Sequence, residues 1–352
     1  MQDNTGRGIG RRAVTTALAA GLALPALRRG AAAAQVETPS FEVIGVRDPQ
    51  LGAQLAVAEA LSLFKEQGLD VTVRWTQSAA DTLTIMGGGA ANVAVGSSFT
   101  QVVLSGQKLP VRTISSLANI AGTQGFVLSP GVKLSHPREL EGKRLAFTQG
   151  NSQVLLLAKL GEIYGFDPTR IQLVNMNQSE GVVAASRGDV QGLLGWEPNL
   201  YRLVSMGGTL YATGSTVYVS GKPEPRPDGD LLLFNHSLLV ATQDWIDTKP
   251  NTLAALLRAL VKANEVLLKD RAKALTVLQR VLRIDPEALK VMTTANKYEL
   301  GITPALIASH RFQSNWAKSI NRIQEIAPPE ACFSTRIAQM VSPALVTWKP
   351  AT

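Results

Sequence analysis

Alternating and helical spacings of apolar residues follow one another along the chain from Phe41 onward. Residues 41–46, FEVIGV, alternate apolar and polar positions before the turn signal Asp48-Pro49, and they predict a strand. A helical face follows, with apolar residues at positions 57, 60, 61 and 64, and Gly68 is placed to end that helix. Repetition of this strand-and-helix unit predicts an α/β fold, with mixed, mostly parallel sheets and helices on both faces.

Further elements extend the same pattern to the end of the chain. The predicted strands are 69–75, 92–95, 111–115, 125–128, 145–148, 171–174 and 190–194. The predicted helices are 81–86, 154–164, 250–268, 271–281 and one beginning at 286. A Pro- and Gly-rich loop at 221–230 precedes an extended apolar stretch, 231–242, which we expect to return toward the first part of the fold. We therefore expect one lobe of residues 35–122 plus 244–352 and a second lobe of residues 123–243, with a hinge of two strands.

Three predicted strand-to-helix loops carry Gly, Ser, Asn and Gln: Gln77–Asp81, Gly96-Ser97-Ser98 and Gly150-Asn151-Ser152. In such sheets ligands bind beyond the carboxyl ends of the strands. A helix N-terminus there offers unpaired N–H groups to an anion, and serine hydroxyls add donors. The loops therefore predict a site for a polar or anionic small molecule. The alternative for Ser98 is a helix N-cap with no ligand involved.

Several kinds of chemistry find no support in the sequence. There is no phosphate-binding Gly-x4-Gly-Lys-Ser/Thr loop, no complete Gly-x-Gly-x-x-Gly and no Gly-x-Ser-x-Gly nucleophile elbow. The histidines, at 136, 236 and 310, are not at metal-ligand spacing. The single cysteine, Cys332, excludes an internal disulfide. We predict neither a cofactor nor a metal site.

The first 34 residues have the composition of an export signal. Arg11-Arg12 precede an uncharged stretch, Ala13–Leu27, which is too short and alanine-rich for a membrane span, and Ala31–Ala34 provide a small-residue cleavage context. The arginine pair indicates a twin-arginine signal, with a general secretory signal as the alternative. We expect cleavage near Gln35 and a soluble protein of the bacterial periplasm.

The positive charge of the whole chain does not indicate a nucleic-acid partner. The formal net charge is +8, but residues 1–34 hold five arginines and one aspartate. The rest of the chain has 30 basic and 26 acidic residues and no basic cluster that could follow a phosphate backbone.

Four segments, taken in order, resemble one family. They are GAQLAVAEALSLFKEQGLDV (52–71), GGGAANVAVGSSFTQVVLSGQKLPV (87–111), LEGKRLAFTQGNS (140–152) and SRGDVQGLLGWEP (186–198). Together they resemble the periplasmic substrate-binding proteins of ABC importers for nitrate, sulfonates, taurine and thiamine-precursor pyrimidines. Ser62 departs from the pattern, since the family tends to have glycine there.

The resemblance implies a type II periplasmic binding protein. Its two lobes would close on a small anionic or zwitterionic solute, and an inner-membrane ABC permease would receive that solute from a monomeric binding protein. The ligand-binding residues implied by the family's pocket loops are Arg47, Gln50, Gln77, Ser78, Ser97, Ser98, Asn151, Ser152, Gln178, Trp196 and Glu197.

Three of these residues keep alternative interpretations. Arg47 either contacts a sulfonate or carboxylate or is a solvated loop arginine. Trp196 either covers an apolar part of the ligand or packs on a helix. Glu197 either stabilises a helix N-terminus or, facing the cleft, favours a ligand with an amine.

The alternative to a binding protein is an enzyme on the same fold. The resemblance extends to a pyrimidine synthase that depends on a cysteine-rich motif and to sulfinate-cleaving enzymes with a cysteine nucleophile. The predicted cleft loops hold serine instead of cysteine. We therefore expect binding without catalysis.

Overall fold

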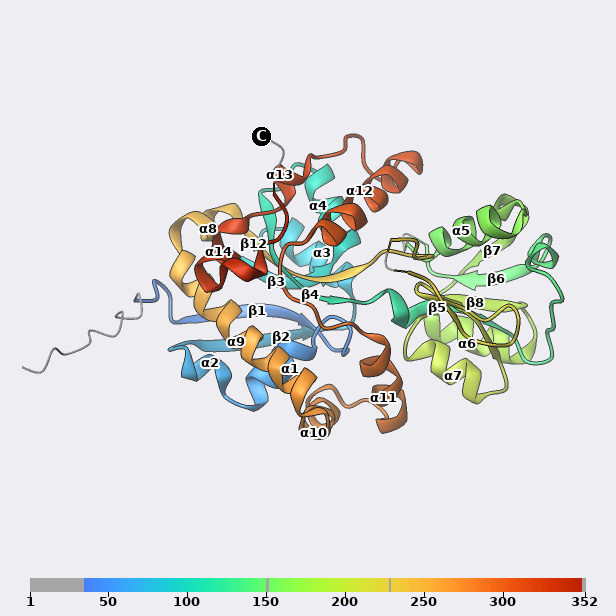
Figure 1. Cartoon of the computed structure of the whole chain (residues 1–352), viewed down its shortest axis with the longest axis horizontal. Helices are drawn as coiled ribbons and strands as arrows, with labels where there is room; N and C mark the ends of the chain where they lie inside the picture. Colours follow the sequence, from blue (N-terminus) through green and yellow to red (C-terminus); the bar gives the residue numbers. More distant parts are fainter. Residues whose placement is uncertain (1–34, 150–151, 228, 350–352) are drawn as a thin grey trace, which may run out of the picture. The chain divides into compact units, whose positions relative to one another are not determined.

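The computed structural model describes residues 35–149, 152–227 and 229–349, and it contains two mixed β-sheets (Figure 1). The predicted export signal, residues 1–34, lies outside the described residues.

The first sheet has five strands in the order β2-β1-β3-β12-β4. Its strands are β1 (Ser40–Val46), β2 (Asp70–Thr76), β3 (Val93–Ser97), β4 (Val111–Asn119) and β12 (His236–Thr242). The second sheet has seven strands in the order β11-β10-β9-β5-β8-β6-β7. They are β5 (Gln124–Leu128), β6 (Arg144–Phe147), β7 (Gln172–Asn175), β8 (Gly192–Trp196), β9 (Thr209–Thr213), β10 (Thr216–Val217) and β11 (Glu224–Pro225).

Both sheets are mixed, as predicted: most strands of each sheet run in one direction, and a central strand of each runs the opposite way. Strand β12 runs antiparallel to both β3 and β4, and β5 runs antiparallel to both β8 and β9. The reason is connectivity. Strand β5 enters the second sheet directly from the first, and β12 enters the first sheet from the second. Each entering strand starts at the edge where its parallel neighbours end, so it runs in the opposite direction.

Two segments carry the chain between the sheets. The first crossing is residues 120–123, and the second crossing is residues 231–235. The two lie side by side, because the Ile120 N–H donates to the Asn235 carbonyl over 3.0 Å. The extended stretch 231–242 thus returns to the first sheet and forms β12 there.

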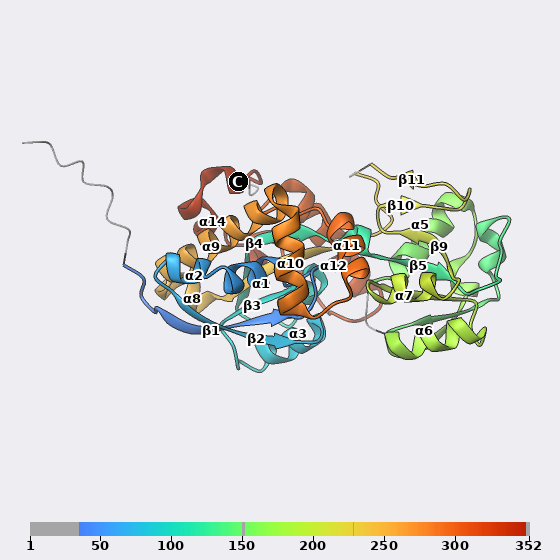
Figure 2. The same cartoon turned by 90° about the horizontal axis from the view of Figure 1, so that it is seen from below.

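Helices cover both faces of the first sheet (Figures 1 and 2). On one face, α1 (Ala53–Ala60), α9 (Pro250–Lys269) and α10 (Arg271–Leu282) bury a large aliphatic core. On the other, α3 (Ala79–Gly87), α4 (Ser98–Gly106) and α12 (Pro304–Ser319) contribute to a smaller core that includes Leu104, Leu306 and Cys332. The remaining helices of this part are α2 (Leu63–Glu66), α8 (Gln243–Thr248), α11 (Pro286–Ala295), α13 (Pro329–Cys332) and α14 (Thr335–Val341).

The second sheet is also covered on both faces. Helix α5 (Val154–Tyr164) packs its leucines against Phe126 and Leu145. Helices α6 (Gln178–Arg187) and α7 (Asn199–Ser205) bury Val182 and Leu203 against the opposite face (Figure 2). The bounds of α5 agree with the prediction, because a leucine-rich segment lies between a polar loop and Gly165, which ends the helix.

Among the described residues, no helix is both long enough and apolar enough to cross a lipid bilayer. The longest, α9, carries charged residues such as Arg258 and Lys262 along its outer face.

Candidate functional site

A cavity of about 630 Å³ lies where loops from both sheets meet. Its walls come from the loops that follow β1, β2 and β3 and from those that follow β6, β7 and β8. This is the carboxyl edge of the parallel strands in each sheet, where α/β proteins place their ligands. The described residues from the predicted set that line it are Gln50, Gln77, Ser78, Ser97, Ser152, Gln178 and Trp196.

Of the helices that begin at this cavity, α3, α4 and α6 each start at a residue whose side chain caps the helix. Ser78 caps α3 and accepts from the Asp81 N–H over 3.3 Å. Ser97 caps α4 and accepts from the Thr100 N–H over 3.2 Å. Asn177 caps α6 and accepts from the Glu180 N–H over 2.9 Å. Each cap satisfies the amide at the third helical position.

The amides at the first and second helical positions have no partner within the helix. Ala79 and Ala80 of α3, Phe99 of α4, and Gln178 and Ser179 of α6 hold such positions, and all of them line the cavity. The positive end of each helix dipole therefore faces the same volume, which favours a negatively charged ligand group there.

Ser98 has a different role from the predicted one. It is the first residue of α4, its side chain is buried, and Ser97 is the cap. The Ser98 hydroxyl donates to Asn235 Oδ1 over 2.9 Å and accepts from the His236 N–H over 3.1 Å. Ser98 thus holds the second crossing against α4 and does not line the cavity.

Arg47 does not line the cavity either. One guanidinium nitrogen donates to the Val281 carbonyl over 3.1 Å, and the guanidinium carbon lies 5.7 Å from the centre of the Trp75 ring. These contacts direct Arg47 toward α10. The solvated-loop alternative is also inexact, since the side chain is half-buried and bonded.

Glu197 lies beside the cavity with its side chain buried. Its Oε2 accepts from the Tyr201 N–H over 2.8 Å, and burial raises the pKa of its carboxyl group to about 7. Its side chain thus caps an amide in the first turn of α7, which is the structural alternative.

Gln50 lines the cavity, but both ends of its amide are engaged. The nitrogen donates to the Glu197 carbonyl over 2.8 Å, and the oxygen accepts from the Thr123 hydroxyl over 2.7 Å. Trp196, the last residue of β8, is half-buried and lines the cavity. Asn151 lies outside the described residues.

Several lining residues were not predicted as ligand contacts, namely Asp48, Phe99, Gln124 and Asn235. Gln124 and Asn235 stand at the ends of the two crossings, where no strand-to-helix motif marks them. Asp48 has the sequence of an ordinary turn. The Asn235 side-chain oxygen accepts from the Ser98 hydroxyl, a contact between distant residues that no local motif predicts.

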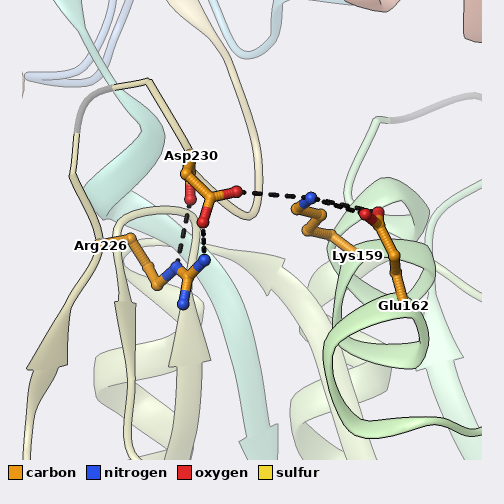
Figure 3. Close-up of polar contacts among 4 residues, drawn as sticks. All are labelled: Lys159, Glu162, Arg226 and Asp230. Carbon is orange, nitrogen blue, oxygen red and sulfur yellow. Dashed lines mark hydrogen bonds and ion pairs between the residues drawn. The ribbon is translucent and has the colours of Figure 1, made fainter.

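An ion-pair network holds the chain ahead of the second crossing (Figure 3). Lys159 of α5 lies 3.4 Å from Asp230 and 3.1 Å from Glu162, and Arg226 also pairs with Asp230. Helix α5 starts at the cavity, and the second crossing ends there at Asn235. The network therefore links α5 to the chain that leads into the second crossing. Ion pairs with exposed partners contribute little to stability.

Electrostatically, the cavity has one charged side chain among its described lining residues, Asp48. Burial raises the pKa of this carboxyl group to about 6, and the N–H groups of Leu51 and Gln50 oppose that increase. Among the described residues, no group of three His, Cys, Asp or Glu side chains is arranged to hold a metal ion.

A family model described as NMT1/THI5 like matches residues 52–274, more than half of the chain. The chain belongs to the NMT1/THI5-like family. The matched range includes both crossings and the cavity-lining loops other than the one that follows β1.

Curated relatives of this family member include both binding proteins and enzymes. The taurine-binding periplasmic protein of Escherichia coli is 27% identical over 44% of this chain and 48% of its own length. The 4-amino-5-hydroxymethyl-2-methylpyrimidine phosphate synthase of Aspergillus parasiticus is 22% identical over 63% of this chain and 64% of its own length. The matches thus span about half to two thirds of these relatives.

The fold is similar to that of solved periplasmic binding proteins. The aliphatic sulphonate binding protein SsuA from Escherichia coli superimposes with a TM-score of 0.71 over 84% of this chain and 92% of its own, at 10% identity. The predicted two-sheet α/β architecture of a periplasmic binding protein is therefore confirmed.

Proposed function

We propose that this protein is the solute-binding component of an ABC import system and that it holds a small anionic or zwitterionic organic solute in the cavity. The observation that carries the proposal is the meeting of three helix starts, from both sheets, at one cavity. The first amides of α3 and α4 come from the first sheet and those of α6 from the second, so one ligand could bind both parts of the fold at once.

The lining supports an organic ligand. Serine and glutamine side chains such as Gln77, Ser152 and Ser179 supply hydrogen bonds, whereas Phe99 and Trp196 supply apolar surface from opposite sheets. A sulfonate or carboxylate with an attached carbon skeleton satisfies both kinds of wall, and so does an amino sulfonate such as taurine.

The two expected lobes, residues 35–122 with 244–352 and residues 123–243, would move about the two crossings. Ligand contact with both lobes would shift the equilibrium toward the closed form. In the proposed system residues 1–34 direct the protein to the periplasm, and the closed monomer delivers the solute to a membrane permease.

A ligand screen tests the proposal. Thermal-shift measurements over alkanesulfonates, taurine, nitrate, aromatic acids and pyrimidines should find compounds that raise the melting temperature, because a ligand that binds the folded state stabilises it. Calorimetry with a hit should show weaker binding to Ser152→Ala and Gln77→Ala, by about 2- to 10-fold each, the range for a lost neutral hydrogen bond. Ser186→Ala on α6, away from the cavity, is the control. Equal binding by all three variants would exclude this cavity.

An enzyme is the second candidate, since the curated relatives include pyrimidine phosphate synthases. Mass spectrometry of the ligand after incubation separates the two. A binding protein returns the solute unchanged, and conversion of a sulfinate or a pyrimidine precursor would establish the enzyme.

A further inference from the structure

Asp48 lines the cavity, and only one of its two carboxylate oxygens is bonded to another described residue. It follows β1 and lines the cavity. Its Oδ1 accepts from the N–H groups of Gln50 and Leu51 over 2.9 and 2.8 Å. These two bonds hold the carboxylate in place, and Oδ2 has no hydrogen-bond partner among the described residues.

The surrounding loop is fixed from behind. The Pro49 carbonyl accepts from Asn296 Nδ2 over 3.0 Å and from the Tyr298 hydroxyl over 3.3 Å. The neighbouring Arg47 is bonded to Val281 and directed away from the cavity. The carboxylate is thus rigidly presented, and its nearest cation in the sequence does not neutralise it.

No other described lining residue carries a charge. A half-buried carboxylate without a countercharge is costly, and its raised pKa, about 6, reflects that cost. A cation brought by a ligand would remove it. A ligand that is only an anion would instead meet repulsion from Asp48.

We propose that the solute carries a positively charged amine that pairs with Asp48, while its anionic group lies at the helix starts. The solute class is then an organic zwitterion rather than a simple anion. This inference rests on the proposed function of the cavity. The two poles fix the orientation of the ligand, and Phe99 and Trp196 lie along the apolar body between them. A cavity of about 630 Å³ has room for a body larger than that of taurine.

Matched ligand pairs test this. Calorimetry at pH 7.5 compares taurine with ethanesulfonate, 3-aminopropanesulfonate with propanesulfonate, and 2-(cyclohexylamino)ethanesulfonate with 2-cyclohexylethanesulfonate. In at least one pair, the wild-type protein should bind the amine-bearing sulfonate about 10- to 100-fold more tightly than its amine-free counterpart, as expected for a charge-assisted contact.

Asp48→Asn keeps an oxygen for the Gln50 and Leu51 amides and removes the charge. It should lose most of the preference for the amine and bind the amine-free partner as well as, or better than, the wild type. Asp70→Asn, which makes the same change at the opposite end of the first sheet, should leave both affinities unchanged. Thermal melting of each variant checks that it is folded.

The outcomes separate the two proposals. Equal binding of amine and amine-free ligands by the wild type, or an unchanged preference in folded Asp48→Asn, overturns the inference and leaves the binding function standing. Binding of neither member of any pair, together with no hit in the wider screen, overturns the proposed function and the inference with it.

Discussion

The Gln50 side-chain nitrogen donates to the Glu197 backbone carbonyl over 2.8 Å, so a loop of the first sheet is bonded to the end of β8 in the second. The same side chain accepts from Thr123 in the first crossing over 2.7 Å. One buried amide therefore links both sheets and the crossing between them at the edge of the cavity.

Gln50→Ala should destabilise the protein by about 1–3 kcal/mol, because it leaves a buried carbonyl without a donor. Urea unfolding measures the change. Gln77→Ala, at an exposed cavity residue, should change stability by less than about 0.5 kcal/mol. Equal changes in the free energy of unfolding would show that the two Gln50 hydrogen bonds do not stabilise the protein.

Glu197→Gln should stabilise the protein at pH 8 and have no effect at pH 4. Burial raises the pKa of Glu197 from its ordinary value of 4.5 to about 7, so the folded state binds the proton more tightly than the unfolded state. The contribution of Glu197 to stability is present below about pH 4.5 and is lost as the pH rises through 7. Glutamine keeps the acceptor for the Tyr201 N–H, and the expected gain is on the order of 1–3 kcal/mol. Melting temperatures across this pH range would reveal the difference, and a constant offset at all pH values would contradict it.

His236 should have the opposite pH dependence. Its ring is buried at the start of β12, and burial lowers its pKa to about 4 from 6.5. The unfolded state therefore takes up the proton first, and stability is lost as the pH falls from about 6.5 toward 4. His236→Leu should remove this part of the acid destabilisation, on the order of 1–3 kcal/mol, when urea unfolding is compared at pH 4.5 and 7.5. A parallel pH dependence in the variant and the wild type would argue against it.

Ser62→Gly should stabilise the protein by about 0.5–1 kcal/mol. Ser62 has a φ of 59°, in the left-handed region that glycine adopts without strain, and its side chain is exposed. Ser186→Gly, within α6, is the matched control and should destabilise by a similar amount because glycine is a poor helix former. Urea unfolding of both variants should give opposite signs.

Gly195→Ala should destabilise the protein by about 1–3 kcal/mol. A Cβ atom at Gly195 would lie 2.0 Å from Gln178 Oε1, so the Gln178 side chain would have to leave Thr148 and the Leu194 carbonyl. Combining it with Gln178→Ala should cost less than the sum of the two single changes, because the overlap is then removed. Strict additivity in this double-mutant cycle would refute the overlap.

The sequence determined the local elements and the kind of site. Apolar spacing predicted helix 154–164 and most strands of both sheets, because burial of one face imposes a regular period, but it did not predict the short strands β9, β10 and β11. Polar loops after strands predicted that Ser78, Ser97 and Ser152 meet at one cavity, since the carboxyl ends of parallel strands share an edge, and the family resemblance added Gln178. Ser62, where the family resemblance leads one to expect glycine, has a left-handed backbone conformation that the sequence analysis did not predict.

Which of two neighbouring residues lines the cavity depends on contacts with distant parts of the chain. Arg47 and Asp48 are adjacent in the chain, yet α10 binds the arginine and leaves the carboxylate at the cavity. Ser97 and Ser98 divide in the same way, because Asn235, more than a hundred residues away, takes the second hydroxyl. Strand direction was likewise set by the two crossings. Each of these outcomes depends on a partner distant in sequence, and periodicity reports only the local environment that a residue shares with its neighbours.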